Sequence, residues 1–178
     1  MGSEATKRFL VLHDYGMGGL WWWVHAQSPR HVLETFAEVE VIDDVDTVER
    51  AESWALDEVA HDATDLPAGL DDLRAQRDRQ RAHPGFGALA DRDIVYLRRR
   101  WDGAEGVDPA DYFMEVGHDG RRTRQVEVRD DGTAFKSTPD DWAFNPPVVD
   151  LFDPELPNEE ITRGAFETAW ARAAYEDE

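Results

Sequence analysis

The sequence predicts an α+β protein in which an N-terminal β-β-α-β unit with a helical extension precedes an antiparallel meander with a C-terminal packing helix. Three observations lead to this prediction. Short stretches rich in β-branched and aromatic residues occur in both halves of the chain. Asp-Gly pairs separate such stretches in the second half, which is a strong hairpin signal. Segments with apolar residues at helical spacing follow good capping residues.

The chain opens with a predicted β-hairpin. Residues 7–14 have the composition of a short, largely buried strand. Residues 15–19 form a glycine-rich turn, and residues 20–26 form an aromatic, β-branched strand. Ser28 then offers an N-cap oxygen and Pro29 a pre-set first helical residue, so a helix follows the hairpin. A third strand over residues 39–42 completes the β-β-α-β unit.

Two further helices are expected before the middle of the chain. Asp46 is expected to cap a helix that carries Val48, Ala51, Ala55 and Val59 at roughly helical spacing. Residues 70–81 alternate in charge, which predicts a polar helix that is solvated on most sides. The glycine- and proline-containing residues 83–87 form the best linker.

We therefore expect a domain over residues 1–90 and a second over residues 91–178. The alternative of a single merged domain stays open, because the sequence does not show whether the two predicted sheets join.

The second half predicts a four-stranded meander. Its strands are expected over residues 94–101, 112–117, 124–129 and 133–136. Asp119-Gly120 and Asp131-Gly132 supply the turns. Thr162 is expected to cap a last helix. The apolar stripe of that helix should pack on the meander; it consists of Ala165, Phe166, Ala169, Trp170 and Ala173.

Charge and composition exclude several classes of function. The 178 residues include 39 acidic and 19 basic side chains, which gives a net charge of -20 at pH 7, and no cysteine. Without cysteine there is no disulfide scaffold, thiolate nucleophile or zinc ribbon. The charge argues against nucleic acid as a ligand. No apolar run reaches the length of a membrane span, so no membrane partner and a cytoplasmic location are expected.

The second half carries a residue pattern that extends from the predicted meander to the last helix. It consists of Arg121, Arg124, Val126, Glu127, Val128, Asp131 and Gly132, then Glu160, Ile161, Thr162, Phe166, Glu167, Trp170 and Ala173. In this pattern the chain resembles the bacterial domain of unknown function 6881 family, over somewhat under half of its length. The resemblance implies a small α+β module with one sheet and a C-terminal helix, and it implies no known chemistry. Acidic domains of this type look like the immunity partners of bacterial toxins.

The first hairpin carries one candidate site, for a small ligand or a metal-dependent enzyme. Trp21 and Trp23 share one face of the strand, and Trp22 lies on the other, where a role in the core is expected. His13 and His25 are placed to face each other across the hairpin. The alternative function would use His13, Tyr15, Trp21, Trp23 and His25 as pocket residues. No metal or other cofactor is assigned to them, because chance pairing of histidine and aspartate is frequent in this composition.

The function that the sequence favours is non-enzymatic binding. No serine lies in a nucleophile elbow and no carboxylate pair is diagnostic, so no catalytic residue is assigned. We expect an acidic binding protein, of the immunity or inhibitor type, that neutralises a basic protein partner. The sequence does not set its oligomeric state. The residues expected to contact the partner, with charge for steering and exposed aromatics as anchors, are Asp140, Asp141, Trp142, Phe144, Asp150, Phe152, Asp153 and Glu155.

Overall fold

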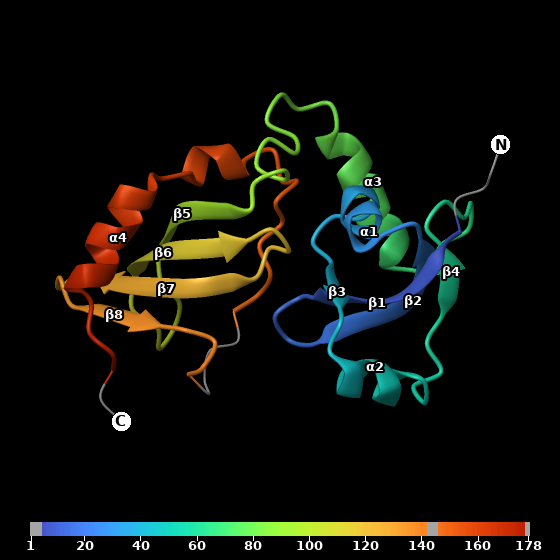
Figure 1. Cartoon of the computed structure of the whole chain (residues 1–178), viewed down its shortest axis with the longest axis horizontal. Coiled ribbons are helices and arrows are strands. Elements are labelled where there is room, and N and C mark those ends of the chain that lie inside the picture. Colours follow the sequence, from blue (N-terminus) through green and yellow to red (C-terminus); the bar gives the residue numbers. More distant parts are fainter. Residues whose placement is uncertain (1–4, 142–145, 177–178) are drawn as a thin grey trace. The chain divides into compact units, whose positions relative to one another are not determined.

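The computed structural model describes residues 5–141 and 146–176 of the chain. The chain divides into two compact units, which we call unit 1 (Met1–Phe86) and unit 2 (Gly87–Glu178). Each unit has a four-stranded sheet and its own helices, so the protein has the predicted α+β fold (Figure 1). The division after Phe86 falls close to the expected boundary at residue 90.

The sheet of unit 1 is built on the predicted hairpin. Its strand order is β3-β1-β2-β4, and β1 and β2 pair antiparallel along their whole length. β4 pairs parallel to β2, which the sequence did not predict. The strands are β1 (Lys7–Asp14), β2 (Gly19–Ala26), β3 (Glu40–Ile42) and β4 (Glu58–Ala60).

Three helices accompany this sheet: α1 (Pro29–Thr35), α2 (Val45–Ala51) and α3 (Leu70–Gln80). The Ser28 hydroxyl caps α1 as predicted, because it accepts a hydrogen bond from the backbone N–H of His31 at 3.1 Å. Pro29 occupies the first turn of the helix.

The expected long helix with Asp46 as its cap is wrong at both ends. Asp44 caps α2 instead, by accepting a hydrogen bond from the backbone N–H of Thr47 at 2.9 Å. The helix ends at Ala51, and Ala55 has a φ of 51°, which an α-helix does not tolerate. Val59 lies in β4, where pairing with β2 overrides the helical spacing of the apolar residues.

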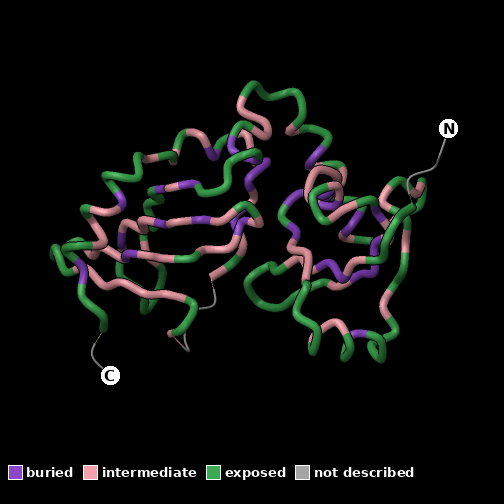
Figure 2. Tube along the Cα trace, viewed as in Figure 1, coloured by how far each residue is buried: buried purple, intermediate pink, exposed green. Residues whose placement is uncertain are grey.

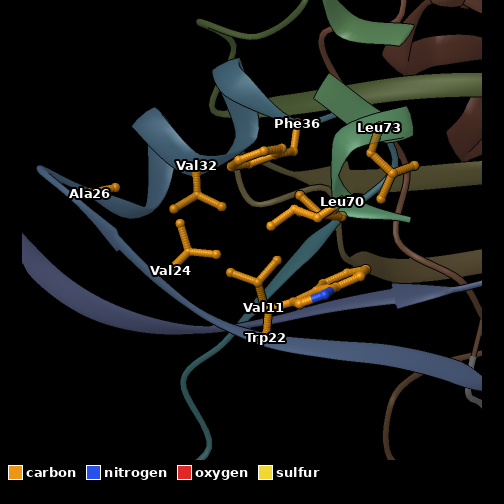
Figure 3. Close-up of a cluster of buried hydrophobic side chains, with 9 residues drawn as sticks. Val11, Trp22, Val24, Ala26, Val32, Phe36, Leu70 and Leu73 are labelled. Carbon is orange, nitrogen blue, oxygen red and sulfur yellow. The ribbon is translucent and has the colours of Figure 1, made fainter. Parts of the chain in front are cut away.

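Helices cover both faces of this sheet. On one face, α1 and α3 enclose a core that includes Val11, Trp22, Val24, Phe36 and Leu70 (Figure 3). The predicted core role of Trp22 is thus confirmed. On the other face, Leu10 and Trp23 pack with Ala51 of α2. Purple segments mark these buried positions in Figure 2.

Helix α3 is less solvated than its polar sequence suggests. Leu70, Leu73 and Arg77 recur at helical spacing and are all buried. Arg77 is the only buried charged residue in the described part of the chain, at 1% exposure. Its Nη2 donates hydrogen bonds to the backbone carbonyls of Leu33 and Phe36 at 2.8 and 2.9 Å.

The sheet of unit 2 is the predicted antiparallel meander. Its strand order is β5-β6-β7-β8, and every neighbouring pair is antiparallel. The expected Asp-Gly turns connect the later strands, with positive φ at both Gly120 and Gly132. The strands are β5 (Ile94–Trp101), β6 (Ala110–Gly117), β7 (Arg122–Arg129) and β8 (Ala134–Ser137).

The last helix, α4 (Arg163–Arg172), packs on one face of this sheet, as predicted. Thr162 caps it by accepting a hydrogen bond from the backbone N–H of Ala165 at 3.1 Å. Phe166 is fully buried, with its ring centroid 5.4 Å from that of Tyr96 on β5. A short 3-10 helix, η1 (Leu156–Glu159), precedes α4 and contacts β5.

None of the helices within residues 5–141 and 146–176 has the length and apolar character needed to cross a membrane.

Candidate partner-binding surface

Acidic side chains gather at one end of the unit 2 sheet. Because β5 to β8 form an antiparallel meander, the β5–β6 loop and the β7–β8 turn lie at the same end. The segment after α4 joins them, since Ala174 pairs with Phe135 on β8. Six carboxylates from these three segments define what we call the acidic end: Asp102, Glu105, Asp108, Asp130, Asp131 and Glu176.

Two arginines link the segments of the acidic end. Arg100 binds Asp130 through two hydrogen bonds of 2.7 and 3.1 Å and lies 3.5 Å from Asp102. Arg129 lies 3.7 Å from Glu176. These two cations fix the segments to each other but leave the acidic end with more carboxylates than they can neutralise.

The carboxylates that hold these turns are ionised at neutral pH. The hydrogen bond from Arg100 holds the pKa of Asp130 below its ordinary value. Asp131 accepts hydrogen bonds from the backbone N–H and the hydroxyl of Thr133, at 2.9 and 2.6 Å, and these lower its pKa. Neither group therefore loses its charge near pH 7.

Glycine shapes the β5–β6 loop. The loop closes on itself through paired backbone hydrogen bonds between Ala104 and Val107. Gly103 has a φ of 89°, and a Cβ at this position would lie 2.9 Å from the carbonyl oxygen of Val107. Only glycine fits both conditions without strain. The loop therefore has a defined shape that presents its acidic residues.

Apolar side chains are exposed among these carboxylates. Trp101 is 45% exposed, Val107 52% and Tyr175 54%. All three lie in or next to the segments of the acidic end. Large apolar residues ringed by charge are typical of protein-binding surfaces, where an aromatic anchor supplies affinity and the charged rim supplies steering.

The arginines of unit 2 are mostly engaged within the unit. Arg98 pairs with Asp111 at 2.8 Å and Arg99 with Glu159 at 2.9 Å. Arg124 binds both Glu115 and Glu167, and Arg129 binds Glu127 at 2.9 Å. The acidic excess of the chain is therefore carried by carboxylates that remain at the surface.

Most of the acidic residues expected to bind a partner between 140 and 155 make local hydrogen bonds, and their role in partner binding stays a prediction. Asp141, Asp150, Asp153 and Glu155 each accept a hydrogen bond within three residues, from Thr138, Phe152, Glu155 and Asn158 respectively. Asp140 and Glu155 are exposed. The side chains of Asp141, Asp150 and Asp153 hold turns of this irregular segment.

Of the three aromatic residues expected as anchors in that segment, the structure describes only Phe152. Phe152 is 6% exposed and belongs to the core of unit 2, so it is not available as a surface anchor. Its burial corrects the expectation of an exposed aromatic residue. Trp142 and Phe144 lie outside the described residues.

The residues of the first hairpin do not converge on a pocket. His13 pairs with Leu20 and His25 with Arg8, so the two histidines lie at opposite ends of the hairpin. The expectation that they face each other was wrong, because a tight turn sets the register of the whole ladder.

The members of that candidate set lie in different local surroundings. His13 Nδ1 lies 2.8 Å from the Glu38 carbonyl oxygen, and His25 Nε2 lies 2.6 Å from Glu58 Oε1. Trp23 is buried, and Trp21 packs edge-on against Trp54, whereas Tyr15 is 55% exposed. Within the described residues, no three histidine, aspartate or glutamate side chains gather as a metal site.

Compared with known proteins, the chain matches no family model, no curated protein and no solved structure. The resemblance of its second half to the domain of unknown function 6881 family stays a prediction.

The acidic end was not singled out from the sequence, although its parts were visible there. The predicted meander already placed residues 102–109 and 130–133 at one end of a sheet. Combining that topology with the position of each carboxylate would have found most of the surface. The contribution of Glu176 depends on a pairing between Phe135 and Ala174 that has no sequence signal.

Proposed function

We propose that this protein is a non-enzymatic binding protein that neutralises a basic protein partner through the acidic end of unit 2. The proposal makes it an immunity or inhibitor type of protein that acts in the cytoplasm. The observation that carries it is the combination of six carboxylates with exposed Trp101, Val107 and Tyr175 at one end of the four-stranded sheet.

The carboxylates and the exposed aromatic residues of the acidic end should contribute to binding in different ways. Exposed carboxylates attract a basic partner over distances of about 8–10 Å at physiological salt and so raise the rate of encounter. An aromatic side chain that becomes buried on contact supplies a large share of the affinity. Trp101 lies at the end of β5, a regular strand, so little conformational freedom is lost when it binds.

The alternative, a ligand-binding or enzyme module on the first hairpin, has less support. Its histidines are separated along the hairpin and Trp23 is buried. A common pocket would need these side chains to line one cavity, which is not how they lie.

Retention of protein from the native host on the immobilised chain tests the proposal. We expect a basic protein to be retained at about 50 mM salt and released well below 1 M, because screening removes the attraction between exposed charges. The absence of any basic protein at low salt would contradict the proposal. Retention that does not change with salt would contradict the role of the acidic end.

A further inference from the structure

Two histidines from separate parts of unit 1 lie with their rings in contact. His31 is in the first turn of α1, and His61 directly follows β4, an edge strand of the sheet. The ring centroids are 4.1 Å apart, and the ring planes are inclined by 56°. Both residues are partly buried. The pair therefore joins the start of α1 to the segment that leaves β4.

Hydrogen bonds to β2 fix the position of one ring. The backbone N–H of His61 donates to the carbonyl of His25 at 2.9 Å, and Nδ1 of His61 lies 3.1 Å from the same oxygen. A carbonyl oxygen only accepts hydrogen bonds, so Nδ1 of His61 carries a hydrogen, and in the neutral ring Nε2 has the free electron pair. Protonation of this ring therefore adds a hydrogen at Nε2 and leaves the bond to β2 in place.

The second ring has no acceptor for a further N–H group. Nδ1 of His31 is buried and forms no hydrogen bond within the part of the chain that the structure describes. A protonated imidazole carries an N–H at both nitrogens, so protonated His31 would bury an N–H without an acceptor. Because water does not reach this atom either, protonation of His31 requires the contact between the rings to open.

Neither ring has a carboxylate partner among the described residues. Glu34 of α1 is bound by Arg30 at 3.0 Å, and Glu58 of β4 is bound by His25 at 2.6 Å. Asp62, in the segment after β4, is exposed to solvent. No ion pair therefore balances a positive charge on either ring of the pair.

Helix α3 brings a cation to the same region. Nη1 of Arg74 donates a hydrogen bond at 2.6 Å to the carbonyl of Ala63, which lies just after His61 in the chain. The charged and titratable side chains on the elements around the pair are Arg30 and Glu34 on α1, His25 on β2, Glu40 on β3, Glu58 on β4, Asp62 after it, and Asp71, Asp72, Arg74, Arg77, Asp78 and Arg79 on α3. Protonation of both rings would therefore place two like charges side by side in a region that already holds a guanidinium.

We infer that the His31–His61 contact is a pH-sensitive device, which holds the start of α1 in place while the rings are neutral and releases it when they are protonated. An unperturbed histidine has a pKa of about 6.5, and a released ring titrates in this way. The closed contact excludes a proton that the released form binds, so the contact is favoured above about pH 6.5 and is lost as the pH falls below that value. One pH unit lower, the released form should be favoured about tenfold more. This device lies in unit 1 and does not depend on the proposed partner.

Nuclear magnetic resonance of the unmodified chain between pH 7.5 and 5.5 tests the device directly. We expect a nuclear Overhauser effect between the two rings at pH 7.5 and its loss at pH 5.5. Exchange of the Phe36 amide hydrogen, which is bonded to the Val32 carbonyl of α1, reports opening of the helix. After correction for the intrinsic effect of pH, this exchange should be about tenfold faster at pH 5.5. Persistence of the ring contact with both rings protonated, or an unchanged corrected exchange rate, would overturn the inference.

His31→Gln removes the titrating group and keeps a residue suited to its place in the helix. With Ser28 as the N-cap, glutamine at this position completes a capping box, so α1 should form. We expect the acid-dependent rise in Phe36 exchange to be absent from this variant. His83→Gln is the matched control, because His83 is exposed and lies after α3; it should keep the rise in full. An undiminished rise in His31→Gln would overturn the inference, and so would its loss in His83→Gln.

Discussion

Arg77 donates a hydrogen bond from Nη2 to the backbone carbonyl of Phe36 at 2.9 Å, and the arginine is 1% exposed. A second bond joins the same nitrogen to the carbonyl of Leu33. Both carbonyls belong to the C-terminal end of α1, where helical carbonyls lack partners within the helix. Arg77 of α3 therefore supplies the hydrogen bonds that these carbonyls of α1 lack. The two helices cover the core of unit 1 together.

Replacing Arg77 with alanine should destabilise unit 1 by about 2–4 kcal/mol, because one buried and one part-buried carbonyl lose their donor and a cavity remains. Urea unfolding, followed through the amide resonance of Val24, measures the effect. Arg79→Ala is the matched control on the same helix, since Arg79 is exposed and should change stability by less than about 0.5 kcal/mol. Equal effects of the two variants would show that Arg77 does not join the helices.

Arg124 makes the attachment of α4 dependent on pH. Its hydrogen bonds lower the pKa of Glu115 on β6 and of Glu167 on α4. Groups whose pKa is lowered by folding stabilise the folded state above their ordinary pKa, and that contribution is lost as the pH falls through the folded pKa. The stability of unit 2 should therefore decline below about pH 4.3.

Glu167→Gln should reduce this dependence, because one of the two carboxylates can no longer be protonated. Chemical unfolding of unit 2 at a series of pH values between 7 and 3 measures the slope. Glu105→Gln, in an exposed loop, should keep the slope of the unmodified chain. If Glu167→Gln kept it as well, the ion pair with Arg124 would not hold α4.

Gly103 and Gly106 of the β5–β6 loop both have a positive φ, but replacing them with alanine should reduce stability to different extents. Gly103→Ala should cost more than Gly106→Ala, because a Cβ at Gly103 meets the Val107 carbonyl and Pro109, whereas the space at Gly106 is open. We expect about 1–2 kcal/mol at Gly106 from backbone conformation alone, and a larger loss at Gly103. Thermal unfolding of both variants provides the comparison. A reversed order would contradict the described loop conformation.

Trp101 should act as an anchor for the partner rather than as a core residue. Trp101→Ala is expected to weaken partner binding at least about tenfold, with little change in stability, because the side chain is 45% exposed. Tyr15→Ala, at an exposed aromatic residue of unit 1, should leave binding unchanged. Surface plasmon resonance with the retained partner measures both. Full affinity in Trp101→Ala would remove Trp101 from the interface.

Local patterns predicted the hairpin and the meander well. The Asp-Gly turns at Gly120 and Gly132, the Ser28 cap and the Thr162 cap each depend on a few neighbouring residues. Non-local pairing was not visible. Val59 looked helical because Val48 and Ala51 precede it at suitable spacing, but a parallel pairing with β2 places it in a strand.

The candidate site was harder to predict than the fold. Phe152 directly precedes an acidic residue in a proline-containing segment, so its burial in a core was not expected from the sequence. Arg77 lies in a charge-rich helix, and only the position of α1 shows why it is buried. Both cases depend on contacts between segments far apart in the sequence, which periodicity does not reveal.

The measurement that bears most directly on the proposed function compares two triple variants of equal charge. One, Asp102→Asn with Glu105→Gln and Asp108→Asn, removes three charges from the acidic end. The other, Asp57→Asn with Asp62→Asn and Asp65→Asn, removes three exposed charges from unit 1. The proposal predicts that the first variant binds the basic partner at least about tenfold more weakly at low salt and that its affinity varies less with salt, while the second keeps the affinity of the unmodified chain. Equal affinity of the two variants would contradict it.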